Sequence, residues 1–158
     1  MPARSDLWFD SIILNMNVNN QKQLFQKLAQ HTSKLIGTPE ETLYENLMRM
    51  EEQQNSSMGH GVAIPHHKLP RLTRPMFIFS KLGKAIQYHA NDGDPVDLIC
   101  FVLSPKHEGP IHLRRLAKAA RFLNNKEFRQ NLRDAKTKDD IKNALQNANT
   151  SRKMTKVA

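Results

Sequence analysis

The sequence predicts an α/β protein, with a mixed β-sheet sandwiched by α-helices in a single domain. Strand-like and helical patterns are interspersed along the chain, which is the order expected when helices cover a sheet. The run VDLICFVLS, residues 96–104, is nearly all apolar after Asp97 and is typical of a central strand buried on both faces. A chain of 158 residues is long enough for one domain with a proper hydrophobic core.

Four segments are expected to form the strands of this sheet. The alternation of apolar and polar residues in IILNMNV is a strand pattern, and so is the short apolar run VAIP before a turn-rich link. The turn signal NDGDP separates the last two strands. The strands are therefore expected at residues 12–18, 62–65, 76–82 and 96–104.

Two amphipathic helices are expected between the first two strands. Apolar residues at helical spacing predict the first over residues 20–36, with Asn19 or Asn20 as its N-cap and Gly37 as its C-terminal stop. The second begins at TPEE, where Thr38 as N-cap and a glutamate three residues later predict a capping box. The polar run EEQQNSSMGHG ends this helix as a loop.

Three helices are expected after the last strand. The first covers residues 111–124, and a shorter one follows at about 126–133. Thr137 with Asp140 three residues on predicts the capping pair of the last helix. Apolar spacing assigns the buried face of the first of these helices to Leu113, Leu116, Ala117, Ala120 and Leu123.

Composition and charge narrow the class of protein. The net charge is +9, from 24 Lys and Arg against 15 Asp and Glu, which favours contact with acidic surfaces. One cysteine, Cys100, makes an internal disulfide framework impossible, and its place in LICFVL predicts a small buried hydrophobe. No apolar stretch reaches the ~18 residues of a membrane span, and the N-terminus lacks the apolar core of a signal peptide, so a cytoplasmic location is expected.

The C-terminal end differs from the rest of the chain. Residues 148–158 are polar and basic and show no period, which predicts a disordered tail. The folded domain is therefore expected to comprise residues 1–147.

Three of the seven histidines fall within GHGVAIPHHKLP, residues 59–70: His60, His66 and His67. Such imidazoles could be metal ligands, a proton relay, a nucleophile or surface residues. Zinc is disfavoured because no cysteine is nearby, the spacing matches no zinc-finger pattern and adjacent histidines do not readily face one ion. Pro65 fixes the backbone just before His66, which suits a nucleophile held at the end of a strand.

Histidine is suited to carry a phosphoryl group, because neutral imidazole is nucleophilic near pH 7 and its nitrogen later leaves readily. Such a site also needs cations or N–H donors for the phosphoryl oxygens. His112 lies at the start of a predicted helix, where free N–H groups and the helix dipole favour anions. Arg49, near the end of the second helix, can offer its planar fork to phosphate oxygens.

GHGVAIPHHKL resembles the GNGIAIPHGK-type signature of the IIA domains of the bacterial phosphoenolpyruvate-dependent phosphotransferase system. The similarity is to the fructose/mannitol type, especially to the nitrogen-type regulatory proteins. Three further segments resemble the family in the same order: LMRMEE, DGDPVDLICFVLSP and HLRRLAKAARFL. The resemblance covers roughly residues 7–147 and implies a mixed sheet sandwiched by helices.

The resemblance implies a role for three residues. His66 matches the family's phosphorylated histidine, which accepts the phosphoryl group on Nε2. His112 matches the second active-site histidine, and Arg49 matches the active-site arginine. His60 stands where the family usually has Asn and His67 where it usually has Gly.

Two functions follow as hypotheses. In the first, the chain is a stand-alone regulatory phosphocarrier that takes a phosphoryl group from an HPr-type phosphohistidine protein on His66, with no metal, nucleotide or other cofactor at this step. In the second, it is an unphosphorylated binding module whose basic stripe of Arg114, Lys118 and Arg121 meets an acidic protein or nucleic acid. The scarcity of Trp and Tyr disfavours nucleic acid.

Overall fold

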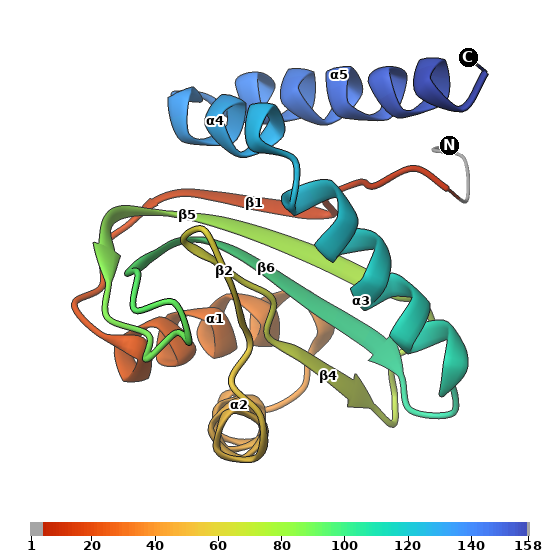
Figure 1. Ribbon diagram of the computed structural model, residues 1–158. Helices are drawn as coiled ribbons and strands as arrows, with labels where there is room; N and C mark the ends of the chain where they lie inside the picture. Colours follow the sequence, from red (N-terminus) through yellow and green to blue (C-terminus); the bar gives the residue numbers. More distant parts are fainter. Residues whose placement is uncertain (1–4, 158) are drawn as a thin grey trace.

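The computed structural model describes residues 5–157 as one six-stranded mixed sheet with helices on both faces, which confirms the predicted fold class (Figure 1). The strands are β1 (Ser11–Met16), β2 (Ser57–Gly59), β3 (Val62–Ala63), β4 (His66–Leu69), β5 (Met76–Ile86) and β6 (Val96–Pro105). The helices are α1 (Gln21–Ile36), α2 (Glu40–Gln53), α3 (Pro110–Leu123), α4 (Lys126–Asp134) and α5 (Lys138–Val157). In this part of the chain, no helix combines the length and apolar character needed to cross a bilayer.

Strand β6 is the centre of the sheet, as its apolar sequence predicts. It pairs antiparallel with β5 on one side and parallel with β3 and β4 on the other. The order is β1-β5-β6-β3-β2, and β4 continues along β6 beyond β3. Every residue of β6 except Asp97 is buried, so both of its faces are covered by helices.

Two hydrophobic cores lie on the two faces of the sheet. Leu98, Cys100 and Val102 of β6 face the layer of α3, α4 and α5, whereas the intervening residues face α1 and α2. Figure 1 shows these two helical layers on opposite sides of the strands. Burial raises the pKa of the Cys100 thiol to about 12, so this cysteine is an inert core residue, as predicted.

Three of the predicted helix ends are confirmed. The Asn20 side chain accepts a 2.9 Å hydrogen bond from the Gln23 N–H at the start of α1, and Gly37 ends that helix in the left-handed region at φ 80°. At α5, Thr137 Oγ1 accepts from the Asp140 N–H, while the Asp140 carboxylate accepts from the Thr137 N–H, both at 3.1 Å. This reciprocal pair is the predicted capping box.

Three predictions of local structure are wrong. α2 starts at Glu40 with Pro39 as a cap that makes no side-chain hydrogen bond, so Thr38 lies one residue too early to cap it. The link after Pro65 contains strand β4, which the turn-rich sequence does not indicate. On α3, Leu113 is 65% exposed and Ala117 is also exposed, because the helix is rotated to bury residues that include His112.

Residues 148–157 are helical and do not form the predicted disordered tail, since α5 continues to Val157; Ala158 lies outside the described residues. The Leu7 N–H donates to Asn149 Oδ1 at 3.0 Å, and Asn149 Nδ2 donates to the Leu7 carbonyl at 2.9 Å. Lys153 lies 3.5 Å from the Asp6 carboxylate. These contacts with the N-terminal segment stabilise the last turns of a helix that has few apolar residues of its own.

Candidate functional site

His66 is the first residue of β4, so it begins a short strand of its own, whereas the sequence predicts it at the end of the preceding strand. It follows Pro65, whose carbonyl accepts a 3.0 Å hydrogen bond from the Val102 N–H of β6. Successive side chains of a strand point to opposite faces. Leu69 packs in the core with α1 and α2, so His67 shares that face, while His66 and Lys68 point to the α3 face.

His66 and His112 are in direct contact. His66 Nδ1 lies 3.0 Å from His112 Nε2, and the ring centroids are 5.1 Å apart at a tilt of 51°. His112 is the third residue of α3, next after Pro110 and Ile111 at the helix start, and is only 4% exposed. The contact uses Nδ1 of His66 and leaves Nε2, on the far edge of the ring, for a second group.

A chain of polar side chains continues from His112 into the protein. His112 Nδ1 lies 2.7 Å from Ser104 Oγ, which also accepts a 2.9 Å hydrogen bond from Arg115 Nη1. Arg115 Nη2 is 2.6 Å from Glu108 Oε2, and these two side chains are 15% and 14% exposed. The order Glu108–Arg115–Ser104–His112–His66 is called the histidine network below.

The sequence does not single out Ser104, Glu108 or Arg115, which lies next to the basic stripe of Arg114, Lys118 and Arg121. Two signals could have found Ser104 and Arg115. Ser104 interrupts the apolar run from Leu98 to Pro105 as its one polar residue, near the end of β6. Arg115 lies three residues after His112, which places the two side chains on one face of a helix.

The imidazoles of the site are neutral near pH 7. Burial and then the positive charges of His66, Lys68, Arg115 and His67 lower the pKa of His112 to about 4. Burial and then Lys68 lower the pKa of His66 below its ordinary value of 6.5. A neutral His66 keeps a lone pair for nucleophilic attack, and Lys68 is a cation on the same face that the sequence reasoning did not single out.

Arg49 is exposed on α2, where the sequence predicted it. Its charge lowers the pKa of His67, after the larger effects of burial and of His66, so Arg49 lies near His67 on the α2 side of β4. The structure therefore brings His66 and His112 together, while Arg49 makes no hydrogen bond to either ring among the described residues.

The unusual residues His60 and His67 have different settings. His60 lies between two glycines, and all three have positive φ: 88° at Gly59, 57° at His60 and 78° at Gly61. Asn is frequent in this region, and His also tolerates it, which accounts for the exchange. His67 lies in extended β4, where a side chain of any size fits the backbone.

The family model of the phosphoenolpyruvate-dependent sugar phosphotransferase system, EIIA 2, matches residues 9–148. The chain belongs to this family. Membership of the EIIA 2 family implies a phosphocarrier with a phosphohistidine phosphotransfer function.

Relatives of this EIIA 2 chain agree with the match. The chain is 35% identical over 145 residues to a nitrogen regulatory protein of Bradyrhizobium diazoefficiens, covering 92% of this chain and 95% of that protein. The crystal structure of nitrogen regulatory protein IIA-Ntr from Neisseria meningitidis has a TM-score of 0.80 and 27% identity, covering 85% of this chain and 92% of the other. IIA mannitol from Escherichia coli, at 14% identity and a TM-score of 0.72 over 85% of this chain and 95% of that one, shares the fold.

Proposed function

We propose that this EIIA 2 protein accepts its phosphoryl group on Nε2 of His66, from a phosphohistidine of an HPr-type carrier, and acts as a regulatory phosphocarrier. The observation that carries the proposal is the 3.0 Å contact between His66 Nδ1 and His112 Nε2. It fixes the ring and leaves Nε2 as the reactive nitrogen.

The histidine network supports one assignment of protons. Attack by Nε2 requires a lone pair there, so the proton of neutral His66 belongs on Nδ1 and is donated to His112 Nε2. His112 must then carry its own proton on Nδ1 and donate it to Ser104 Oγ. Ser104 also accepts from Arg115 Nη1, so its two lone pairs are used by two donors.

The phosphoryl transfer needs no proton donor. The P–N bond of the incoming phosphohistidine breaks, its electron pair stays on the donor imidazole, and a new P–N bond forms to His66 Nε2. Lys68, which is exposed on the face of His66, supplies positive charge for the phosphoryl oxygens. We assign Arg49 the same task, since its exposed side chain lies beside neighbouring His67 and can turn toward the edge of β4.

The regulatory part of the proposal comes from the relatives. The Bradyrhizobium diazoefficiens protein that this chain matches over 95% of its length is called a nitrogen regulatory protein. A phosphoryl group adds a charge of about −1.5 to −2 near pH 7. On a chain with a net charge of +9, that group reverses the local charge beside α3 and so changes which protein docks there.

The test is an intact-mass assay with phosphoenolpyruvate, the first enzyme of the system and an HPr-type carrier of the sugar or nitrogen branch. We expect one acid-labile phosphoryl group in the natural chain, none in His66→Ala and slower transfer in His112→Ala. His89→Asn is the matched control, because it removes an exposed imidazole and keeps a residue that tolerates the φ of 55° at that position.

Two results would contradict the proposal. Phosphorylation of the His66→Ala chain would show that another residue accepts the phosphoryl group. No phosphorylation with carriers of either branch would favour the binding module, with α3 residues Arg114 and Arg121 as its exposed basic surface.

A further inference from the structure

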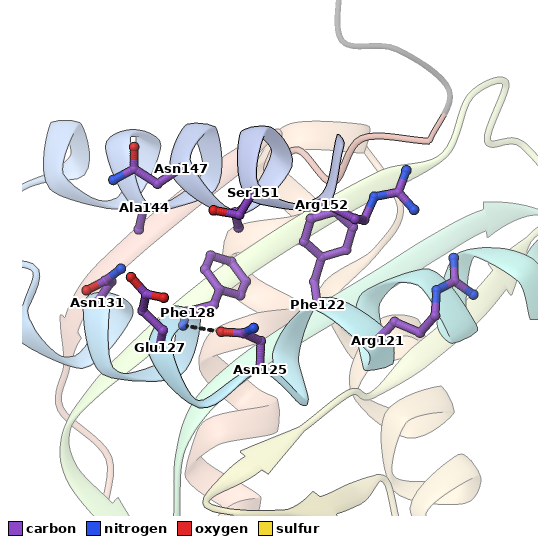
Figure 2. A pocket seen from close by; sticks show the side chains of 11 residues that line it. Arg121, Phe122, Asn125, Glu127, Phe128, Asn131, Ala144, Asn147, Ser151 and Arg152 are labelled. Atoms are coloured by element: carbon purple, nitrogen blue, oxygen red, sulfur yellow. Dashed lines mark hydrogen bonds between the residues drawn. The ribbon is translucent and has the colours of Figure 1, made fainter. Parts of the chain in front are cut away.

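A pocket of about 440 Å³ lies between the end of α3, α4 and α5, at the opposite end of α3 from His112 (Figure 2). Its volume falls within the ~300–1,000 Å³ range of small-molecule sites. We call it the α4–α5 pocket; it is lined by Arg121, Phe122, Asn125, Glu127, Phe128, Asn131, Ala144, Asn147, Ala148, Ser151 and Arg152. Ser151 and Arg152 lie beyond residue 148, where the match to the EIIA 2 family ends.

The middle of the pocket is apolar. Phe122 and Phe128 meet edge to face, with ring centroids 6.2 Å apart and planes at 73°. Ala144 and Ala148 of α5 complete this section, and their small side chains leave the space open. The Asn125 side chain caps α4 by accepting from the Phe128 N–H at 2.9 Å, which holds the Phe128 backbone in place. An apolar ring or short chain therefore fits here.

One end of the pocket is cationic. Figure 2 shows Arg121 and Arg152 on either side of Phe122, with their guanidinium groups at the same end. The Arg152 guanidinium carbon lies 5.5 Å from the Phe122 ring centroid. Its Nε is buried and has no hydrogen-bond partner among the residues that the structure describes. A buried N–H without an acceptor is costly, and a carboxylate that draws the guanidinium toward the pocket would supply one.

The other end of the pocket carries amides and one acid. Asn131, Asn147 and Glu127 lie there, away from the two arginines (Figure 2). The amides can donate to or accept from a polar group on a ligand. The Glu127 carboxylate repels a second negative charge, so this end disfavours a dicarboxylate.

We propose that the α4–α5 pocket binds a small organic monocarboxylate with an apolar body. The carboxylate pairs with Arg152 and Arg121, the body packs on Phe122 and Phe128, and the far end lies between the asparagines. This site is independent of His66 and goes beyond the phosphocarrier function. It uses the part of α5 that extends past the family match.

The test is a titration of the full chain with 3-phenylpropanoate, up to about 10 mM, followed by amide and arginine Nε–H resonances. We expect saturable shifts at the lining residues, with the Arg152 Nε–H resonance moving downfield as it gains an acceptor. The amide 3-phenylpropanamide, which keeps the body without the charge, should bind at least fivefold more weakly. Acetate, which keeps the charge without the body, should give no saturable shift over the same range.

Two variants make the test specific. Arg152→Gln should weaken 3-phenylpropanoate at least fivefold and leave the amide unchanged, while Ala148→Leu should block both by filling the pocket. Lys142→Gln, an exposed change elsewhere on α5, is the matched control. The dispersion of the amide resonances outside the pocket in each variant reports that the fold is intact. No shift up to about 10 mM, equal binding of acetate, or unchanged binding in Arg152→Gln would overturn the proposal.

Discussion

His66 Nδ1 and His112 Nε2 lie 3.0 Å apart although the two residues are 46 positions apart in the sequence. The contact exists because β4 pairs in parallel with β6 and α3 begins directly beyond the end of β6. Ser104, on β6, is the residue that joins these elements, since its hydroxyl is 2.7 Å from His112 Nδ1. The geometry of His66, the proposed acceptor, therefore depends on a serine that does not touch it.

Replacing Ser104 tests this dependence. In Ser104→Ala, His112 Nδ1 and Arg115 Nη1 both lose their partner. We expect phosphoryl transfer to His66 to slow by about fivefold, which corresponds to a lost hydrogen bond of about 1 kcal/mol. The imidazole ¹⁵N shifts should also show His112 moving from a single Nδ1–H form to a mixture of tautomers.

Ser80→Ala is the control for that change, because Ser80 is also buried in the sheet but its hydroxyl has no hydrogen-bond partner. It should leave transfer and the His112 shifts unchanged, and Ser104→Thr should restore both. A transfer rate in Ser104→Ala equal to that of the natural chain would show that His112 is positioned by its packing alone.

The low pKa of His112 predicts how stability depends on pH. Below pH 6.5 the unfolded chain binds a proton at this imidazole, whereas the folded chain does not until about pH 4. Stability from His112 is therefore complete above pH 6.5 and is lost as the pH falls toward 4, by an amount on the order of 3 kcal/mol. Chemical denaturation of His112→Gln should show a shallower loss over that interval, and identical slopes would contradict the prediction.

Part of this protein could be predicted from sequence because the signal was local. The apolar run of β6, the Asn20 and Gly37 caps and the Thr137–Asp140 pair depend only on neighbours in the chain. β4 could not be found this way, because HHKL has no apolar alternation. It is a strand because its backbone pairs with β6.

The candidate site also contains residues that the sequence predicts and residues that only the fold reveals. His66 and His112 are predicted from two segments that resemble the family, and the structure brings the two rings into contact. The contacts of Ser104 depend on how α3 is rotated about its axis. Apolar spacing predicts Leu113 on the buried face of α3, but in the structure it is exposed. Burying His112 in its place satisfies both ring nitrogens and leaves Leu113 exposed. At the start of α3, the hydrogen bonds of the histidine network decide which face of the helix is buried. The spacing of apolar residues does not indicate these hydrogen bonds.

Gly61 is predicted to be intolerant of a side chain. Its φ is +78°, and a Cβ there would meet Arg133 Nη2 at 2.5 Å and Asp97 Oδ1 at 3.0 Å. The same Nη2 donates to the His60 carbonyl at 2.6 Å, so a methyl group would push apart the loop that leads into β3. We expect Gly61→Ala to lower the free energy of unfolding by about 2–4 kcal/mol.

Gly37→Ala separates the two causes of that loss. Gly37 has a φ of +80° but nothing within 4 Å of the position of a Cβ. Gly37→Ala should lower the free energy of unfolding by roughly 1 kcal/mol, which is the cost of a positive φ at alanine. Denaturant unfolding of both variants measures the difference, and equal losses would mean that the Arg133 contact yields at no cost.

Asn149 is predicted to attach the end of α5 to the N-terminal segment. Its side chain is the partner of both backbone groups of buried Leu7, at 3.0 and 2.9 Å. Asn149→Ala would leave a buried N–H and carbonyl unpaired, so we expect a loss of about 2–4 kcal/mol in the free energy of unfolding. Amide exchange should accelerate together in residues 6–9 and in the last turns of α5.

Thr150→Ala, an exposed neighbour, is the control and should change the free energy of unfolding by less than about 0.5 kcal/mol. If exchange in residues 6–9 stays slow in Asn149→Ala, the N-terminal segment is held by its contacts with β5 and not by α5.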